Sequence, residues 1–113
     1  SVTHVAFNKM IPLGRVVTVE AKVSRAFSSS MEVYMDVFIE DRESGERILS
    51  NEAIYTFVAV DEMGNPVRVP EIVPETELEI KRFEAALRRK QLSLVLAGKM
   101  KPKDATELKA LFQ

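Results

Sequence analysis

The stretch Arg25-Ala-Phe-Ser-Ser-Ser-Met-Glu-Val-Tyr-Met-Asp-Val-Phe-Ile-Glu40 contains a polar turn that leads directly into an alternating run. Apolar side chains stand at every second position from Met31 to Ile39, which is the period of a β-strand with one buried face. The turn places hydroxyls, backbone donors and a cation at the start of this strand. Such a cluster suits a phosphate-bearing ligand, although a serine-rich turn can also be only a turn.

Three other segments carry a strand pattern, so that the predicted strands are residues 2–9, 16–24, 31–40 and 47–60. The last is rich in β-branched and aromatic residues. Turns rich in glycine, proline and aspartate separate the strands from position 12 onward. Because short connections join successive strands, the sequence predicts an antiparallel meander.

The chain then changes to a linker and a charged helix. Residues 67–74 hold two prolines among apolar side chains and are predicted to be extended. Thr76 is a suitable N-cap, and Glu79 completes a capping box for a helix over residues 76–96. We expect a domain over residues 1–98 and a helical tail over residues 99–113, with a short last helix near residues 104–112.

The apolar faces of these strands need a cover that the predicted helix does not supply. The helix is charged around most of its circumference and has one apolar stripe. A sheet with one apolar face must bury that face against another element. We therefore expect either a partner chain or a preceding segment that supplies a core helix.

The composition is that of an ordinary water-soluble domain. The chain has 113 residues, 46% of them hydrophobic and 29% charged, with a net charge of -1. This balance predicts no general affinity for nucleic acid or membrane, and no apolar run approaches the ~20 residues that span a bilayer. The absence of cysteine excludes thiolate chemistry and fits a cytoplasmic location. Basic residues gather at positions 88–90 and continue at Lys99, Lys101 and Lys103.

The residues offer little for catalysis. His4 is the sole histidine and has no acidic neighbour in sequence, and a single histidine without cysteine argues against zinc, so no metal is expected. The three serines lack a visible base. Asn51 and Glu52, inside a predicted strand, are expected to face solvent or a subunit interface. Binding is better supported, because the serine turn and the cations at positions 88–90 could converge on one polyphosphate.

Taken together, the motifs resemble the hotdog-fold acyl-CoA thioesterases from about Val2 to Lys90. The similar pieces are Val2-Thr3, Leu13-Gly14, the Ser-Met-Glu-Val strand, Ser44-Gly45-Glu46, Thr56-Phe-Val-Ala-Val-Asp61 with Gly64, and Val69-Pro-Glu-Ile-Val-Pro-Glu-Thr76. The run between His4 and Leu13 is about four residues shorter than in the family. Two explanations stay open: a true shortening, which would alter the pocket wall near residues 7–10, or a loop that is absent from the sequence.

The resemblance implies an α+β fold in which one antiparallel sheet wraps around a central helix, with a C-terminal helix after it. The central helix and the catalytic residues of the family lie upstream of the matching segment, so no catalytic residue is carried over. We expect an N-terminal third, which carries the central helix, to precede the residues of this chain. The implied assembly is a homo-oligomer, a dimer or a hexamer built as a trimer of dimers.

The implied reaction is hydrolysis of an acyl-CoA thioester to free fatty acid and CoA, without a cofactor beyond the CoA of the substrate. The resemblance also implies three groups of CoA contacts: His4, Val5 and Ala6; Ser29, Ser30 and Met31; Arg89 and Lys90. Two alternatives stay open, a non-catalytic acyl-CoA-binding hotdog module and a hotdog dehydratase.

Overall fold

The structure is a computed structural model that describes residues 2–7 and 11–106, with side chains from residue 11 onward. The chain divides into two compact units, Ser1–Glu71 and Ile72–Gln113, and each is described by itself. The first contains the sheet and the second the helical segment. In the described residues, no helix has the length and apolar character needed to cross a membrane.

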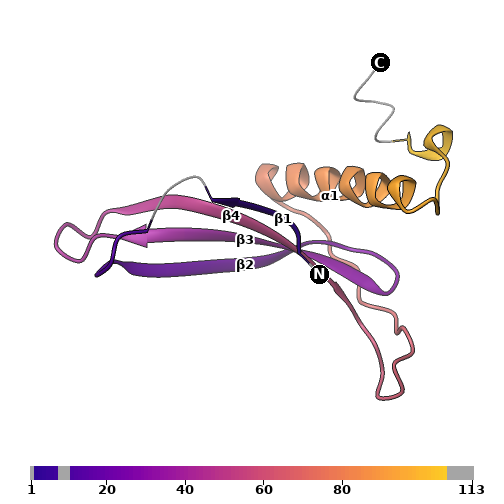
Figure 1. Ribbon diagram of the computed structural model, residues 1–113, viewed down its shortest axis with the longest axis horizontal. Coiled ribbons are helices and arrows are strands. Elements are labelled where there is room, and N and C mark those ends of the chain that lie inside the picture. The colour runs from indigo at the N-terminus through magenta and orange to yellow at the C-terminus, as the bar shows by residue number, and fades with distance from the viewer. Residues whose placement is uncertain (1, 8–10, 107–113) are drawn as a thin grey trace. The chain divides into compact units, whose positions relative to one another are not determined.

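The first unit is a four-stranded antiparallel sheet made of β1 (Val2–Phe7), β2 (Val16–Ala26), β3 (Ser30–Glu40) and β4 (Arg47–Val58). The strands lie in the order β1-β4-β3-β2 (Figure 1). All four predicted strands are confirmed, with ends that differ by at most two residues where the structure describes them.

The meander is only partly as predicted. Strands β2, β3 and β4 follow one another, but β1 pairs with β4 at the opposite edge from β2. A connection over residues 8–15 can reach ~27 Å when extended, whereas three strand spacings amount to ~14 Å. Chain length therefore does not force β1 to lie beside β2, and the apolar pattern does not choose between the two edges.

One face of the sheet is apolar, and part of it is exposed. This apolar face consists of Val17, Val19, Ala21 and Val23 of β2, Val33, Met35, Val37 and Ile39 of β3, and Ala53, Tyr55 and Phe57 of β4. Val19 is 54% exposed and Phe57 is 48% exposed. The first unit itself contains no helix that could cover this face among its described residues.

Irregularities in the ladder bury polar residues. The pairing of β3 with β4 shifts between Val37 and Phe38, which leaves Ser50 as an extra residue of β4. Ser50 and Asn51 are both buried, and the Asn51 amide donates to the Ser50 hydroxyl at 3.1 Å. Exposure to solvent is therefore wrong for Asn51, whose buried amide has the Ser50 hydroxyl as a partner, while the alternative of a subunit interface stays a prediction.

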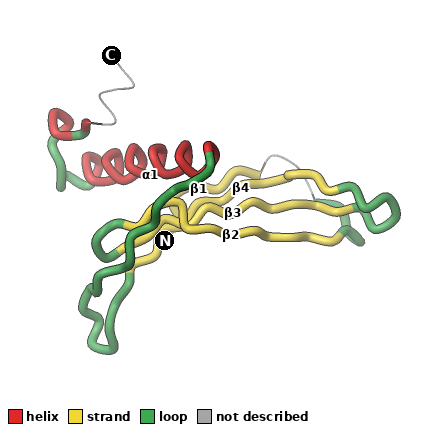
Figure 2. The backbone as a smooth tube through the Cα atoms, turned by 180° about the vertical axis from the view of Figure 1, so that it is seen from behind, coloured by secondary structure: helices red, strands yellow, loops and turns green. Residues whose placement is uncertain are grey.

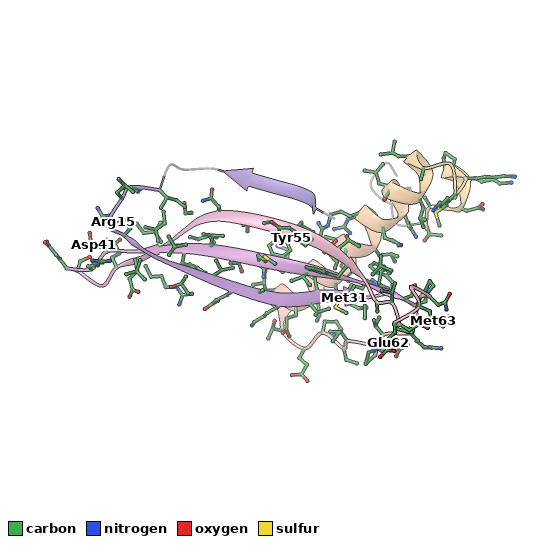
Figure 3. The ribbon with its side chains drawn as sticks, turned by 60° about the horizontal axis from the view of Figure 1, so that its bottom comes forward. Arg15, Met31, Asp41, Tyr55, Glu62 and Met63 are labelled. Carbon is green, nitrogen blue, oxygen red and sulfur yellow. The ribbon has the colours of Figure 1, made fainter. Side chains whose placement is uncertain are left out.

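Charged side chains close the end of the sheet opposite the serine turn. Arg15 pairs with Asp41 there, and Figure 3 shows both far from Met31 at the other end. Arg47 pairs with Glu20 at 2.6 Å, and its guanidinium lies 3.9 Å from the centre of the Phe38 ring. The Arg47 hydrogen bond holds the pKa of Glu20 below its ordinary value. These contacts tie together three strands at this end.

After β4 the chain runs without regular secondary structure to the helix, as Figure 2 shows. Helix α1 (Glu77–Leu96) begins with the predicted capping box, in which Thr76 and Glu79 exchange hydrogen bonds. It ends in a Schellman motif: Lys99 N–H bonds to Leu94, and Gly98, at φ 72°, bonds to Val95. Only glycine adopts this φ without strain.

A short 3-10 helix, η1 (Pro102–Asp104), follows α1. The last helix predicted for the tail falls mainly on residues 107–112, which lie outside the described residues. The predicted boundary between a domain and a tail at residue 98 stays a prediction.

The loop after β4 depends on one carboxylate. Asp61 accepts hydrogen bonds from the backbone N–H groups of Asn65 and Met63, both at 2.9 Å. The Asn65 N–H is the main cause that holds the pKa of Asp61 below its ordinary value of 3.8. Stability from a carboxyl with a lowered folded-state pKa is complete above the unfolded value and is lost as pH falls through the folded value.

We therefore expect the Asp61→Asn variant to be less stable than wild type at neutral pH. The difference should shrink as the pH falls from about 5 to about 2, because only wild type loses a charged acceptor. Urea unfolding across this pH range measures the difference in free energy of unfolding. Glu62→Gln, which removes a neighbouring charge, is the control. Parallel pH profiles for wild type and Asp61→Asn would contradict the role given to this carboxylate.

Candidate functional site

The serine turn, residues 28–30, is fixed by backbone hydrogen bonds to three different segments. The carbonyl of Ser28 accepts from Val69 N–H, that of Ser29 from Ala59 N–H, and that of Ser30 from Phe27 N–H, at 2.8 to 3.0 Å. Val69 is itself buried, 6% exposed. All three serine carbonyls are therefore occupied, and the turn is held in one conformation by the loop that follows β4.

The N–H and hydroxyl donors of Ser28 and Ser29, unlike the carbonyls of the turn, have no hydrogen-bond partner within the described part of the chain. Ser28 is exposed and Ser29 is half-buried. The Arg25 guanidinium lies 5.9 Å from the centre of the Phe27 ring, at the base of the same turn. A rigid turn with unused donors and a nearby cation is a suitable anion-binding element.

The predicted contacts in β1 do not lie beside this turn. His4, Val5 and Ala6 pair with residues 54, 53 and 52 in the middle of β4, whereas Ser30 pairs with Val58 at its end. Four residues along a strand and two strand spacings across the sheet separate His4 from Ser30 by ~16 Å. The two groups could contact one extended ligand, but they form no single cluster.

Arg89 and Lys90 lie in the second unit, on α1. Both are half-buried, and they stand about two turns before the helix ends at Leu96. The last turn of α1 contains no basic residue, so Arg89 and Lys90 lie within the helix and not at its end. The end instead uses the glycine motif described above, which satisfies the last carbonyls without a cation.

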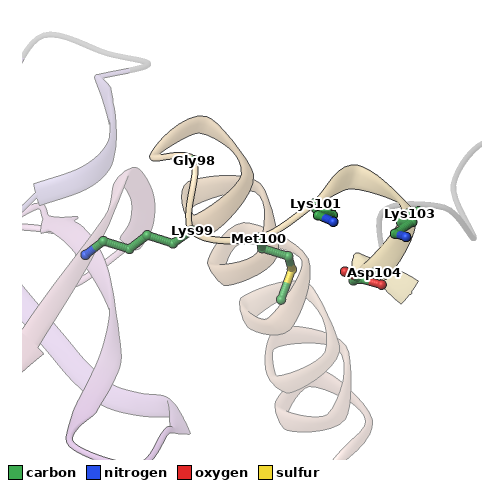
Figure 4. Close-up of a pocket in the computed structure, with 6 residues that line it drawn as sticks. All are labelled: Gly98, Lys99, Met100, Lys101, Lys103 and Asp104. Atoms are coloured by element: carbon green, nitrogen blue, oxygen red, sulfur yellow. The ribbon is translucent and has the colours of Figure 1, made fainter.

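A depression of about 530 Å³ lies beside this helix end and is lined by Gly98, Lys99, Met100, Lys101, Lys103 and Asp104. Figure 4 shows the Lys99 side chain extending away from Lys101 and Lys103. The carbonyl end of a helix also disfavours an anion. The three lysines are thus not gathered into one anion-binding site.

In the described part of the chain, no three histidine, cysteine, aspartate or glutamate side chains are grouped so that they could hold a metal ion. The serine turn therefore remains the candidate site. Its run of three serines was the signal that identified it in the sequence. The buried Glu32 beside it was not identified as a site residue from the sequence.

Comparison with known proteins agrees with the fold. A family model described as "Thioesterase superfamily" matches residues 1–46. The Bacillus subtilis protein named "Uncharacterized acyl-CoA thioester hydrolase YkhA" is 43% identical over 79% of this chain and 52% of its own length. The Helicobacter pylori protein VdlD is 39% identical over 81% of this chain and 52% of its own length. The chain thus spans about half the length of these curated relatives.

Solved structures agree as well. An apo-hexameric acyl-CoA thioesterase superposes with a TM-score of 0.78 at 36% identity, over 85% of this chain and 62% of the other. An acyl-CoA hydrolase from Staphylococcus aureus, solved with butyryl-CoA, CoA and CoA disulfide, superposes with a TM-score of 0.78 at 30% identity. That match covers 100% of this chain and 66% of the other.

The antiparallel sheet, the helix that follows it in sequence and these matches define the hotdog fold of the thioesterase superfamily. The chain belongs to the acyl-CoA thioesterase family of that fold. The fold and the family inferred from the sequence are confirmed.

Proposed function

We propose that the protein hydrolyses acyl-CoA thioesters to free fatty acid and CoA. The observation that carries this proposal is the similarity to chains named acyl-CoA thioester hydrolases, one of them solved with CoA and butyryl-CoA. In this reaction a water oxygen bonds to the thioester carbonyl carbon, the carbon–sulfur bond breaks, and the CoA thiolate takes up a proton. We assign no catalytic residue to this chain and no cofactor to the reaction. We also keep the cytoplasm as the proposed location.

The serine turn is proposed to hold the phosphates of CoA. Its unused N–H and hydroxyl donors support this role, because charge-assisted hydrogen bonds to phosphate oxygens are short and strong. His4, Val5 and Ala6, about 16 Å away in the sheet, would contact the arm of the same extended molecule. Met31 adjoins the turn at the start of β3.

A homo-oligomer is proposed as the active form. The solved relatives include hexameric thioesterases. The exposed apolar face of the sheet supports burial in an assembly, since a contiguous apolar surface of this kind is unfavourable in water.

Mixing the full-length protein with acyl-CoA substrates of short, medium and long chain and a thiol reagent tests the activity. We expect CoA release above a heat-inactivated control, with one fatty acid formed for each CoA. Absence of release at every chain length would overturn hydrolysis. Tight acyl-CoA binding with no release would favour the non-catalytic module instead.

Arg89 and Lys90 are proposed to contribute cations to CoA binding. Replacing both by alanine should raise the Kd for CoA by about tenfold and flatten its dependence on salt, because fewer charges are then screened. Isothermal titration at two salt concentrations measures both effects. The double variant Lys101→Ala/Lys103→Ala removes the same charge from the loop after α1 and should leave Kd nearly unchanged. An equal loss of CoA affinity in the two double variants would show that Arg89 and Lys90 are not part of the site.

A further inference from the structure

A buried carboxylate stands close to the serine turn and is not explained by CoA contacts. Glu32 is 4% exposed, although its side chain ends in a carboxyl group and it lies two residues after the turn. Its Oε1 atom accepts a hydrogen bond of 2.6 Å from the Ser24 hydroxyl. The same hydroxyl lies 3.1 Å from the Glu32 carbonyl oxygen. Ser24 is also buried, at 7% exposed, so the pair is removed from water.

This pair sits at an irregularity of the ladder. Val23 pairs with Val33, but Arg25 pairs with Glu32, so Ser24 is an extra residue in β2. Such a bulge shifts the alternation of side chains by one position for the rest of the strand. The hydrogen bond from Ser24 to Glu32 joins the bulged residue to the neighbouring strand, and it therefore favours the bulged pairing over a regular one.

The pairing beyond the bulge decides how the turn is formed. With the observed register, Ala26 pairs with Met31, and the next pair along the hairpin is Phe27 with Ser30, bonded at 2.8 Å. Ser28 and Ser29 are then left as the two turn residues. Their carbonyls accept hydrogen bonds from the N–H groups of Val69 and Ala59, respectively. Without the extra residue, the register would slip by one, and a different residue would face each partner.

We propose that Glu32 is a positioning residue that holds the serine turn in its phosphate-binding conformation through Ser24. The proposal rests on the proposed CoA function and deepens it. Glu32 does not itself touch the ligand in this arrangement, since its carboxylate is buried and bonded to Ser24. It acts by fixing the bulge, and through the bulge the direction of the Ser28 and Ser29 donors.

The discriminating measurement compares two substrates that differ in the nucleotide portion, which contains the phosphates that the turn would hold. Acyl-CoA carries the nucleotide phosphates, whereas the matching acyl-pantetheine lacks them and presents the same thioester. Loss of binding energy that is equal in the ground state and the transition state raises KM without lowering kcat. For Glu32→Ala and for Ser24→Ala in the full-length protein, we expect KM for acyl-CoA to rise about tenfold with kcat unchanged. The kinetic constants for acyl-pantetheine should stay at wild-type values.

Two further variants complete the design. Glu32→Gln keeps an acceptor for the Ser24 hydroxyl and should restore a KM near wild type. Glu40→Ala removes a carboxylate from the same strand and face, ten residues beyond Ser30, and should have no effect. If Glu32→Ala does not fold, Ser24→Ala carries the test, because it removes a single hydroxyl.

If the variants raised KM equally for acyl-CoA and acyl-pantetheine, Glu32 and Ser24 would have a general structural role, and the proposal would be overturned. Unchanged KM for acyl-CoA in Ser24→Ala and Glu32→Ala would overturn it as well. In both cases wild-type hydrolysis of acyl-CoA would leave the proposed function standing. A wild-type protein that neither hydrolyses acyl-CoA nor binds CoA would overturn the proposed function and this role with it.

Discussion

Replacing Ser29 by aspartate is expected to weaken CoA binding by about 30- to 150-fold. Ser29 is half-buried in a turn whose carbonyls are all bonded, so a new carboxylate cannot easily turn away from the ligand. Two like charges about 5 Å apart at a partly buried site repel by about 2–3 kcal/mol. Isothermal titration with CoA measures the change directly.

The neutral isostere separates charge from shape. Ser29→Asn should bind CoA within a few-fold of wild type, because it keeps the size of aspartate and adds no charge. Ser44→Asp places the same charge in the hairpin turn at the other end of β3 and should leave binding unchanged. If Ser29→Asp binds CoA as wild type does, the phosphates lie elsewhere and the serine turn is not part of the site.

Truncating Ile54 to alanine is expected to destabilise the protein by about 2–5 kcal/mol. Ile54 is 3% exposed and lies in β4, between β1 and β3, so its removal leaves a cavity among elements that cannot easily close. Few large apolar side chains are fully buried in the described residues, and this one therefore carries an unusual share of the packing. Urea unfolding of wild type and variant gives the difference in free energy.

An exposed residue of the same strand provides the control. Val58→Ala, at a position 60% exposed, should change the free energy of unfolding by less than about 0.5 kcal/mol. If the free energy of unfolding falls equally in the two variants, Val58 is covered in the assembled protein. If it falls only slightly in Ile54→Ala, the surroundings collapse onto the truncated side chain.

The strands and the start of the helix could be predicted because they rest on local patterns. Period-two alternation set the strands, and Thr76 with Glu79 formed the predicted capping box. The bulge in β2 also leaves a sequence trace that the strand prediction did not use. Apolar positions run 17, 19, 21 and 23 and then move to Ala26, a phase shift of one at Ser24 and Arg25.

The remaining features depend on contacts between distant segments. The edge that β1 occupies follows from pairing with β4, which no local pattern encodes. The burial of Glu32 and Asn51 follows from bulges and hydrogen bonds that involve Ser24 and Ser50. In the sequence, Glu32 looks like any polar residue on a solvent face. The serine turn was found as a candidate, but its clamping by Ala59 and Val69 required the fold.

A crystal structure of the full-length protein with CoA tests most directly whether the serine turn recognises the nucleotide end of the substrate. We expect phosphate oxygens of CoA at about 3 Å from the N–H and hydroxyl groups of Ser28 or Ser29, with the turn in the conformation described above. CoA phosphates bound away from this turn, for example at the loop of Lys101 and Lys103, would contradict the proposed site.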